Sequence, residues 1–520
     1  MEIAYMVLSI LVWLLPLTFL PKKIYFAFGF LFLFVSPLEI IFVKNLGTPI
    51  TLGYIDSVFN TNFEEAKEQI ISNIGFAIFY AILLSIYLIL LSKIKNSYIS
   101  KRIRISILIL FLLFNVTLFY KMYEIQKIGQ ATKKETLVRA YKTMLSKYSK
   151  VYPLDLILNI NGEIKNNKKV SEFNKDINEF TFHAKSLNDR KEEEIFVLVI
   201  GETSRYNNFH VNGYFRETTP FLDKTENLLS FKNVYSCAYL TEYSIPLIIT
   251  RANPEHKDLQ YKEKTILDAF KEAGFYTAWI ANQSSEKPII KRLQKTADFF
   301  KSNLTDIDTK KFHDEDVIPD FQEILNNNSN KKFIVIHSLG SHFRYSNRYP
   351  EQFKKFTPEI SETGYNNLDY RFKKELINSY DNSILYTDHF LDLLIQNLEK
   401  KNTKSILLFV PDHGENLYDN EQKYFGHGSL KPLIYEYHIP YFIWYSKEYE
   451  KSHPNKILSL KSHINVPISS SCTFYTLLDL ANIQYDNSNN ELIYSISSDK
   501  YQIPQKRYVV NSANETLEVK

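Results

Sequence analysis

The chain has almost no cysteine and almost no net charge. Its 520 residues include two cysteines, Cys237 and Cys472, and carry a formal net charge of +4. Two thiols cannot build a disulfide framework, although one bridge forms if they meet in space. No basic stripe with interleaved aromatic residues is present, which argues against nucleic acid as a partner. We therefore expect neither a disulfide scaffold nor a nucleic-acid-binding protein.

Long apolar runs are missing from the last 400 residues and are confined to the first 120. Four segments there approach the roughly 20 apolar residues that cross a bilayer: Ile3–Leu20, Ile24–Val43, Ile74–Leu91 and Ile103–Phe119. No basic residues precede the first segment, so a cleaved signal peptide is disfavoured. A buried core helix is the alternative for any single segment. Four in succession favour a multi-pass membrane domain over residues 1–120.

The short loops between these segments predict which side of the membrane the rest of the chain occupies. Lys22 and Lys23 lie in the first loop, and the third, "SKIKNSYISKRIR", is strongly basic. The second loop, Lys44–Ser72, is mainly acidic. Because basic short loops stay in the cytoplasm, everything after Phe119 is expected outside. This predicts a membrane protein whose large domain faces the periplasm or the cell exterior.

A lysine-rich stretch follows the last apolar segment. Residues 120–159 are compatible with helix, and apolar residues recur among the lysines, as in "LVRAYKTMLSKY". Such a helix either connects domains in solvent or lies along an anionic bilayer surface, and its position favours the second interpretation. Residues 166–194 are polar and are interpreted as a linker. We expect a membrane domain (1–120), a bridging helix and linker (121–194) and a catalytic domain (195–520).

Beyond residue 194 the pattern is that of an α/β domain with a mostly parallel central sheet. Several expected strands end in polar side chains: "IFVLVIGET" at Glu202, "KFIVIHSLGSH" at His337 and His342, "SILLFVPDHGEN" at Asp412 and His413, and "FYTAWIANQ" at Asn282. The carboxyl ends of parallel strands meet at one edge of a sheet. Carboxylate oxygen with imidazole nitrogen is the ligand set of zinc or a similar divalent ion. His427, in the Gly-flanked "YFGHGS", is expected to serve the same site.

A nucleophile for this site is suggested by "SCAYLTEYSIPL". Thr241 is placed to open a helix there. A hydroxyl at a helix N-terminus faces N–H groups that favour a phosphate, and a bound metal would lower its pKa. An ordinary N-cap threonine explains the same pattern equally well.

The order of these motifs resembles the membrane phosphoethanolamine transferases of the alkaline phosphatase superfamily, which have a sulfatase-like domain and include lipid A-modifying enzymes. The matching stretches are Gly201–Arg205, Gly213–Pro220, Ser236–Pro246, His337–Pro350, Tyr380–Asp388, Asp412–Glu415 and Gly426–Gly428. They occur in the family's order from about residue 195 to 483. A weaker match, "NTNFEEAKE", lies in the second loop.

The resemblance implies a zinc-dependent enzyme of the bacterial inner membrane, with its catalytic domain in the periplasm. Glu202, Asp412 and His413 would bind Zn²⁺, and Thr241 would complete the ligand set as nucleophile. His342 and His427 would act in catalysis beside the transferred phosphate or help to hold a second metal ion. Substrate would contact Asn62, Glu65, Asn282 and His337, with Asn62 and Glu65 at the ethanolamine group. A solvated helix start capped by Asn62 explains the loop motif equally well.

In this family phosphatidylethanolamine gives its phosphoethanolamine to the threonine, diacylglycerol leaves, and lipid A or another envelope acceptor then receives the group. This chain departs from its relatives in having four apolar segments rather than five, and too few cysteines for several disulfides. The alternative functions that the sequence allows are a glycerophosphate transferase, a sulfatase or phosphodiesterase of the same superfamily, and a non-catalytic binding protein. A sulfatase is disfavoured because Ile248 stands where its motif needs arginine.

Overall fold

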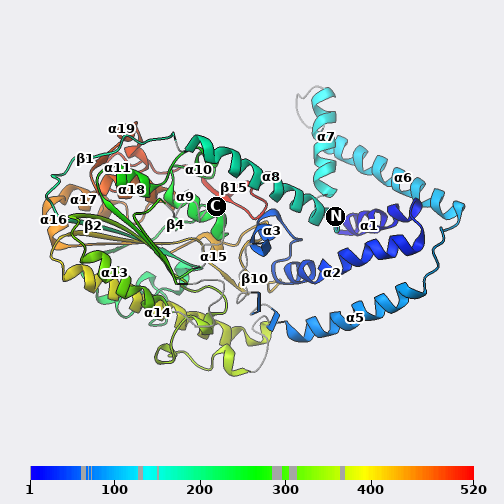
Figure 1. Cartoon of the computed structure of the whole chain (residues 1–520), viewed down its shortest axis with the longest axis horizontal. Helices are drawn as coiled ribbons and strands as arrows, with labels where there is room; N and C mark the ends of the chain where they lie inside the picture. The colour runs from blue at the N-terminus through cyan, green and yellow to red at the C-terminus, as the bar shows by residue number, and fades with distance from the viewer. Residues whose placement is uncertain are drawn as a thin grey trace. The chain divides into compact units, whose positions relative to one another are not determined.

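The computed structural model describes residues 2–59, 66–67, 70–71, 73–126, 133–148, 151–177, 179–283, 296–303, 313–363 and 369–519 (Figure 1). The chain divides into two compact units. The first comprises residues 1–56 and 73–166, and the second comprises residues 57–72 and 167–520. Each unit is described by itself below.

The first unit is helical. Its helices are α1 (Glu2–Leu14), α2 (Lys22–Leu46), α3 (Leu52–Phe59), α5 (Ile74–Lys93), α6 (Lys101–Gln126), α7 (Lys133–Tyr148) and the first half of α8 (Leu154–Ile177). Among the described residues, α2, α5 and α6 are long and apolar enough to cross a membrane. The first apolar segment forms a shorter helix, because α1 ends at Leu14 and a four-residue 3₁₀ turn follows it.

Both basic loops lie at one end of this unit. The amide of Lys22, in the first loop, donates to the carbonyl of Ser97, in the third, at 2.8 Å. This agrees with the orientation that the lysines predict.

Helices α2 and α5 are joined where a proline interrupts the hydrogen bonds of α2. Pro37 has no N–H to offer the carbonyl of Leu33. The hydroxyl groups of Ser36 and of Tyr80, on α5, donate to that oxygen instead, at 2.9 and 2.8 Å. The polar backbone atom is thereby satisfied inside an otherwise apolar unit, as a lipid environment requires.

The stretch expected to bridge the units is helical for longer than its composition indicates. α8 runs on to Ile177, so the first part of the predicted linker is helix. No proline interrupts it, and its lysines and glutamates favour helix. α7 exposes Leu137, Val138, Tyr141 and Leu145 beside its lysines. That α7 lies on a bilayer surface remains a prediction.

The second unit is built on a seven-stranded sheet with the order β3-β11-β8-β2-β7-β5-β6. The strands are β2 (Glu194–Gly201), β3 (Leu228–Ser230), β5 (Tyr276–Ala281), β6 (Phe299–Ser302), β7 (Lys331–His337), β8 (Lys404–Pro411) and β11 (Phe442–Tyr445). Strands β8, β2, β7, β5 and β6 are parallel, whereas β11 is antiparallel to both neighbours. The predicted α/β class with a mostly parallel sheet is confirmed.

Helices cover both faces of the sheet. The described helices of this unit are α9 (Thr241–Ile249), α10 (Leu259–Lys262), α11 (Ile266–Glu272), α13 (Ile318–Leu325), α14 (Lys373–Glu399), α15 (Ile434–Tyr437), α16 (Lys447–Ser452), α17 (Pro454–Ser462), α18 (Cys472–Leu480) and α19 (Ser488–Glu491), and of these α9, α11 and α18 pack on one face and α13 and α14 on the other. Short pairs outside the main sheet are β1 (Lys185–Ser186) with β13 (Ile483–Gln484), β4 (Val234–Tyr235) with β12 (Ile468–Ser469), β9 (Asn416–Leu417) with β10 (Phe425–Gly426), and β14 (Arg507–Val510) with β15 (Thr516–Val519).

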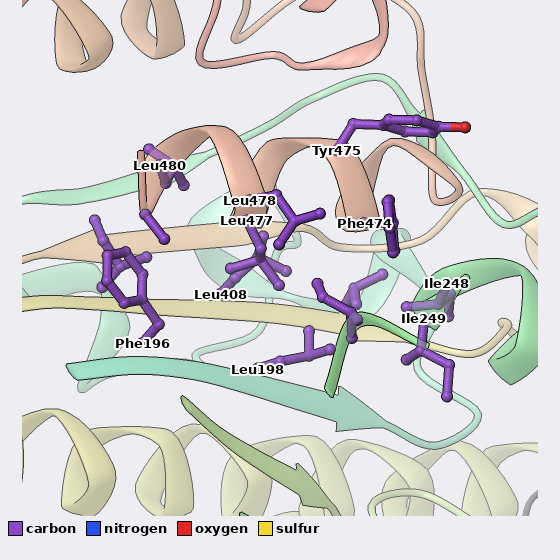
Figure 2. Close-up of a cluster of buried hydrophobic side chains, with 14 of the residues drawn as sticks. Phe196, Leu198, Ile248, Ile249, Leu408, Phe474, Tyr475, Leu477, Leu478 and Leu480 are labelled. Atoms are coloured by element: carbon purple, nitrogen blue, oxygen red, sulfur yellow. The ribbon is translucent and has the colours of Figure 1, made fainter. Parts of the chain in front are cut away.

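The central strand β2 is buried on both faces, as its unbroken apolar run predicts. Phe196 and Leu198 pack with α18 and α9 on one face (Figure 2). Val197 and Val199, which alternate with them, pack with α13 and α14 on the other. Two apolar layers therefore hold the central strands in place.

Candidate metal centre and active site

The register of the parallel strands brings the ends of four of them to one level. Gly201 of β2 pairs with Pro411 of β8, and Ile200 pairs with His337 of β7. His337 in turn pairs with Ala281 of β5. The residues that follow these ends therefore project from the same edge of the sheet, where open α/β sheets bind ligands.

Three of the predicted ligands meet at that edge. Glu202, Asp412 and His413 are fully buried, and each offers one ligand atom within 4.8 Å of the others. Nε2 of His413 lies 3.3 Å from Oδ2 of Asp412 and 3.7 Å from Oε1 of Glu202. Two carboxylates and an imidazole in this arrangement form a donor set that suits zinc.

Each of the three side chains is oriented by a neighbour. Nδ1 of His413 lies 2.8 Å from the carbonyl of Gly414, which leaves Nε2 directed at the carboxylates. Oδ1 of Asp412 accepts the amides of Thr203 and His413 at 3.0 and 2.8 Å. Within the described part of the chain, Oδ2 of Asp412 is buried without a hydrogen-bond partner. A buried carboxylate oxygen in this position is satisfied if it ligates a cation.

The charges of the cluster also favour a cation. Burial and the charge of Glu202 raise the pKa of the Asp412 carboxyl well above its usual range. Burial and the charge of His427 lower the pKa of His413 to about 3, so its imidazole is neutral and able to ligate. Two carboxylates so close together repel each other unless a positive charge lies between them. The residues present therefore fit the zinc ion that the motifs imply.

Thr241 lies beside this cluster. It is the first residue of α9, with Leu240 as the N-cap, so the N-cap role considered for Thr241 is not the one it has. Its Oγ1 lies 3.5 Å from Nε2 of His413. The hydroxyl therefore meets the proposed ligands at a helix N-terminus, where a phosphate is stabilised.

Two serines fix the first turn of α9 against the end of β8. The hydroxyl of Ser244 donates to the carbonyl of Asp412 at 2.6 Å, and that of Ser236 donates to the same oxygen. Both serines are fully buried. The position of Thr241 relative to Asp412 is thus set by buried hydrogen bonds rather than by a surface loop.

His427 stands next to His413, with ring centroids 4.0 Å apart. Its Nδ1 lies 3.0 Å from Oε1 of Glu415, whose other oxygen accepts the hydroxyl of Tyr345 at 2.9 Å. Although burial opposes the charged form, Glu415 raises the pKa of His427 to about 9. His427 is therefore cationic at neutral pH and lies beside the proposed ligand His413.

His342 belongs to the turn that follows β7. Its Nδ1 lies 2.8 Å from the carbonyl oxygen of Phe343. The imidazole is also close enough to the carboxylate of Glu202 to interact with it electrostatically. Gly340 in this turn has a φ of +50°, and a Cβ there would lie 2.8 Å from the carbonyl oxygen of Glu202. The turn therefore packs directly on a proposed ligand.

The predicted substrate residues are less uniform in position. Asn282 is buried, and its amide nitrogen donates to Asp314 at 3.1 Å. His337 ends β7 with its ring edge-on to Trp279, at a centroid distance of 6.2 Å. Asn62 and Glu65 lie outside the described residues. Nearby Ser57, grouped with the second unit, donates to Glu242 at 3.3 Å.

Two residues that orient Glu202 were not predicted. Nε2 of Gln283 donates to Oε2 of Glu202 at 2.7 Å, and Oγ1 of Thr203 donates to Oε1 at 2.6 Å. Both follow expected strands directly, so the signal that identified Asn282 and Glu202 was also available for them.

Comparison with known proteins places this site in a family. The family model described as Sulfatase matches residues 194–483, more than half of the chain. The chain belongs to the sulfatase family. Among its relatives is the phosphoethanolamine transferase EptC of Escherichia coli K12, 32% identical over 306 residues, which are 57% of this chain and 52% of that protein. The chain thus spans about half the length of the curated relatives it matches.

Two solved structures are similar to this one. One is the C-terminal periplasmic domain of E. coli EptC in complex with zinc, 29% identical, with a TM-score of 0.58 over 64% of this chain and 94% of that one. The other is the integral membrane transferase EptA from Neisseria meningitidis, with a TM-score of 0.72 over 92% and 86% of the two chains. At 22% identity the EptA likeness shows the fold alone, membrane helices included. The predicted resemblance to membrane phosphoethanolamine transferases is confirmed.

The two cysteines are both free and buried. Sγ of Cys237 lies 3.2 Å from the hydroxyl of Ser469 and accepts the amide of Ser471 at 3.0 Å. The thiols therefore act as packed core groups, and the bridge that the sequence allowed is not formed.

Proposed function

We propose that this protein transfers phosphoethanolamine from phosphatidylethanolamine to lipid A or another envelope acceptor, through a phosphothreonine formed on Thr241. The observation that carries the proposal is the hydroxyl of Thr241 beside Glu202, Asp412 and His413, at the edge of the sheet where a ligand binds. The names of the relatives, and the zinc held by the EptC domain, support the reaction and the metal.

In the first step Oγ1 of Thr241 attacks the phosphorus of the donor lipid. The hydroxyl gives up its proton, the new Oγ1–P bond replaces the P–O bond to diacylglycerol, and the diacylglycerol oxygen takes up a proton as it leaves. When bound, Zn²⁺ held by Glu202, Asp412 and His413 supplies the positive charge that favours the threonine alkoxide. The amides at the start of α9 stabilise the phosphoryl oxygens.

In the second step an acceptor oxygen attacks the phosphothreonine. The acceptor gives up its proton, the phosphoryl group moves to the acceptor, and Thr241 recovers its hydroxyl. His427, held as a cation by Glu415, stabilises the negative charge of the phosphoryl group. We assign the proton transfers of both steps to His342, which belongs to the turn that packs on Glu202.

A sulfate-ester hydrolysis is not supported, although the family carries that name. A sulfatase motif would place an arginine at position 248, where this chain has isoleucine. Ile248 is fully buried in the apolar core between α9 and the sheet (Figure 2). A guanidinium at this position would face the core rather than a sulfate.

The lipid donor is tested by diacylglycerol release. The purified full chain with zinc is incubated with phosphatidylethanolamine or phosphatidylglycerol of the same acyl composition. We expect release from phosphatidylethanolamine alone. Equal or faster release from phosphatidylglycerol would replace the proposal with a glycerophosphate transferase. Mass spectrometry of lipid A and surface glycans from cells with and without the gene then identifies the acceptor.

A further inference from the structure

The membrane unit contains two acidic side chains without a basic partner. Glu39 lies on α2, inside a candidate span, and Asp155 lies in the first turn of α8. Their carboxyl groups are within hydrogen-bonding range of each other. Asp155 is 0% exposed, whereas Glu39 is partly exposed. Among the described residues, no lysine, arginine or histidine pairs with either. Ionisable groups at membrane depth are costly and usually functional.

Several polar atoms around this pair are unsatisfied. Oδ1 of Asp155 accepts the amide of Leu156 at 2.7 Å, but Oδ2 has no partner within the described ranges. The hydroxyl oxygens of Thr48 and Thr51 are likewise buried without a partner there, and Thr51 is 4% exposed. Buried polar atoms nearly always have a hydrogen-bond partner, and each buried atom without one costs about 1–3 kcal/mol. An ionised Oδ2 of Asp155 can only accept, so it is satisfied if a hydrogen-bond donor binds beside it.

The turn between α2 and α3 brings these atoms together. The amide of Ile50 donates to Oε2 of Glu39 at 2.9 Å. The carbonyl of Ile50 accepts from Nδ2 of Asn159, one helical turn beyond Asp155, also at 2.9 Å. The turn that carries Thr48 and Thr51 is therefore fixed between the two helices that carry the carboxyl groups.

We propose that Glu39 and Asp155, with these two threonines, bind the primary ammonium group of a lipid head group. An ammonium carries three N–H donors and one positive charge, which suits unsatisfied oxygens beside two acids. The partly exposed Glu39 leaves the pair accessible from the surface of the unit. The ligand rests on the proposed function, because phosphatidylethanolamine carries such an ammonium on a lipid.

A proton shared between the carboxyl groups of Glu39 and Asp155 is the simpler alternative to a bound ammonium group. A protonated Glu39 would donate to Asp155 and still accept the amide of Ile50. Glu39→Gln distinguishes the two, because its amide reproduces both of those hydrogen bonds and yet removes the charge. A shared proton therefore predicts that Glu39→Gln binds lipid normally, and an ammonium site predicts that it does not.

Binding is measured on the full chain in detergent, in a Thr241→Ala background so that no transfer occurs. Phosphatidylethanolamine is titrated and the fluorescence of Trp13 is followed. Trp13 lies 6.2 Å from the ring of Tyr152, whose hydroxyl is close enough to both carboxyl groups to interact with them electrostatically. Trp279 and Trp444 are buried in the sheet and provide a constant background.

We expect Glu39→Gln and Asp155→Asn each to raise the Kd for phosphatidylethanolamine at least about tenfold, since a hydrogen bond to a charged group is lost. Glu124→Gln, which removes an exposed carboxylate of the same unit, leaves the Kd unchanged. Phosphatidylcholine, which has no N–H donor, should bind weakly to all variants. Melting temperatures without lipid confirm that each variant is folded.

Unchanged binding of phosphatidylethanolamine by Glu39→Gln overturns the site in favour of the shared proton. An equal loss of phosphatidylglycerol binding also overturns it, because that lipid has no ammonium. This result is separable from the proposed reaction. A wild-type chain that binds phosphatidylethanolamine through Glu39 but releases no diacylglycerol refutes the reaction and supports the site.

Discussion

At the scale of single residues, Asp412 and Thr241 have neighbouring side chains but different proposed tasks. Asp412→Asn removes a charge and an oxygen ligand, so we expect the purified protein to contain clearly less zinc than one ion per chain. Thr241→Ala leaves Glu202, Asp412 and His413 in place and should retain most of its zinc while losing transfer. Elemental analysis of both proteins checks this. Full zinc occupancy in Asp412→Asn would show that this carboxylate does not bind the metal.

A glycine next to the proposed ligands offers a second residue-level prediction. A Cβ at Gly414 would lie 2.2 Å from the carbonyl oxygen of Tyr435, which accepts the amide of Glu415. Because neither backbone moves freely, Gly414→Ala should displace His413, weaken zinc binding and cost about 1–3 kcal/mol of stability. Gly213→Ala is the control. Its φ of +101° is strained for alanine, yet nothing lies within 4 Å of the added Cβ. If the control lost zinc equally, backbone strain rather than the contact would be responsible.

The sequence predicted the three residues that meet at the edge of the sheet, Glu202, Asp412 and His413, but not all of the residues that orient them. Glu202 and Asp412 follow long apolar runs, and that pattern survives folding because the strands are buried on both faces. Ser236 and Ser244 are common residue types whose contacts with the carbonyl of Asp412 depend on the distances of Ser236 and of α9 from the end of β8. Those distances arise from packing, so no local pattern records them.

At the scale of elements, α18 and α9 fix the position of the nucleophile by packing on the sheet. Leu477 of α18 is fully buried in the cluster shown in Figure 2. Leu477→Ala should lower the free energy of unfolding by about 2–5 kcal/mol. Leu458→Ala on α17, where the side chain is 64% exposed, should change it by less than about 0.5 kcal/mol. Denaturant unfolding followed by tryptophan fluorescence measures both. Similar losses would mean that this cluster does not stabilise the unit.

The elements that the sequence predicted least well are the polar or short ones. The first apolar segment has nearly the length of a span, but its helix ends at Leu14, and Pro16 lies in the 3₁₀ turn that follows. α8 continues to Ile177 where charge density suggested a linker. Apolar periodicity identifies helices that are buried. The end of α1 and the continuation of α8 do not depend on burial, so this pattern does not predict them.

At the scale of the whole molecule, the proposed function requires the second unit, which holds Thr241, and the basic loops of the first unit to lie on opposite sides of the inner membrane. Both native thiols are buried, so an introduced cysteine can be labelled selectively. Phe215, 80% exposed, belongs to the catalytic unit, and Ser97 lies exposed in the third loop. A membrane-impermeant maleimide on cells with a permeable outer membrane should label Phe215→Cys and not Ser97→Cys. The reverse pattern would place the catalytic unit in the cytosol.

The central claim is that Thr241 carries the transferred group. The zinc-loaded full chain is mixed with phosphatidylethanolamine in the absence of acceptor, quenched in acid, digested and analysed by mass spectrometry. We expect one added phosphoethanolamine on the peptide that contains Thr241, and none in Thr241→Ala. Diacylglycerol release without a modified Thr241 peptide, or the same modification on another residue of the alanine variant, would contradict the account.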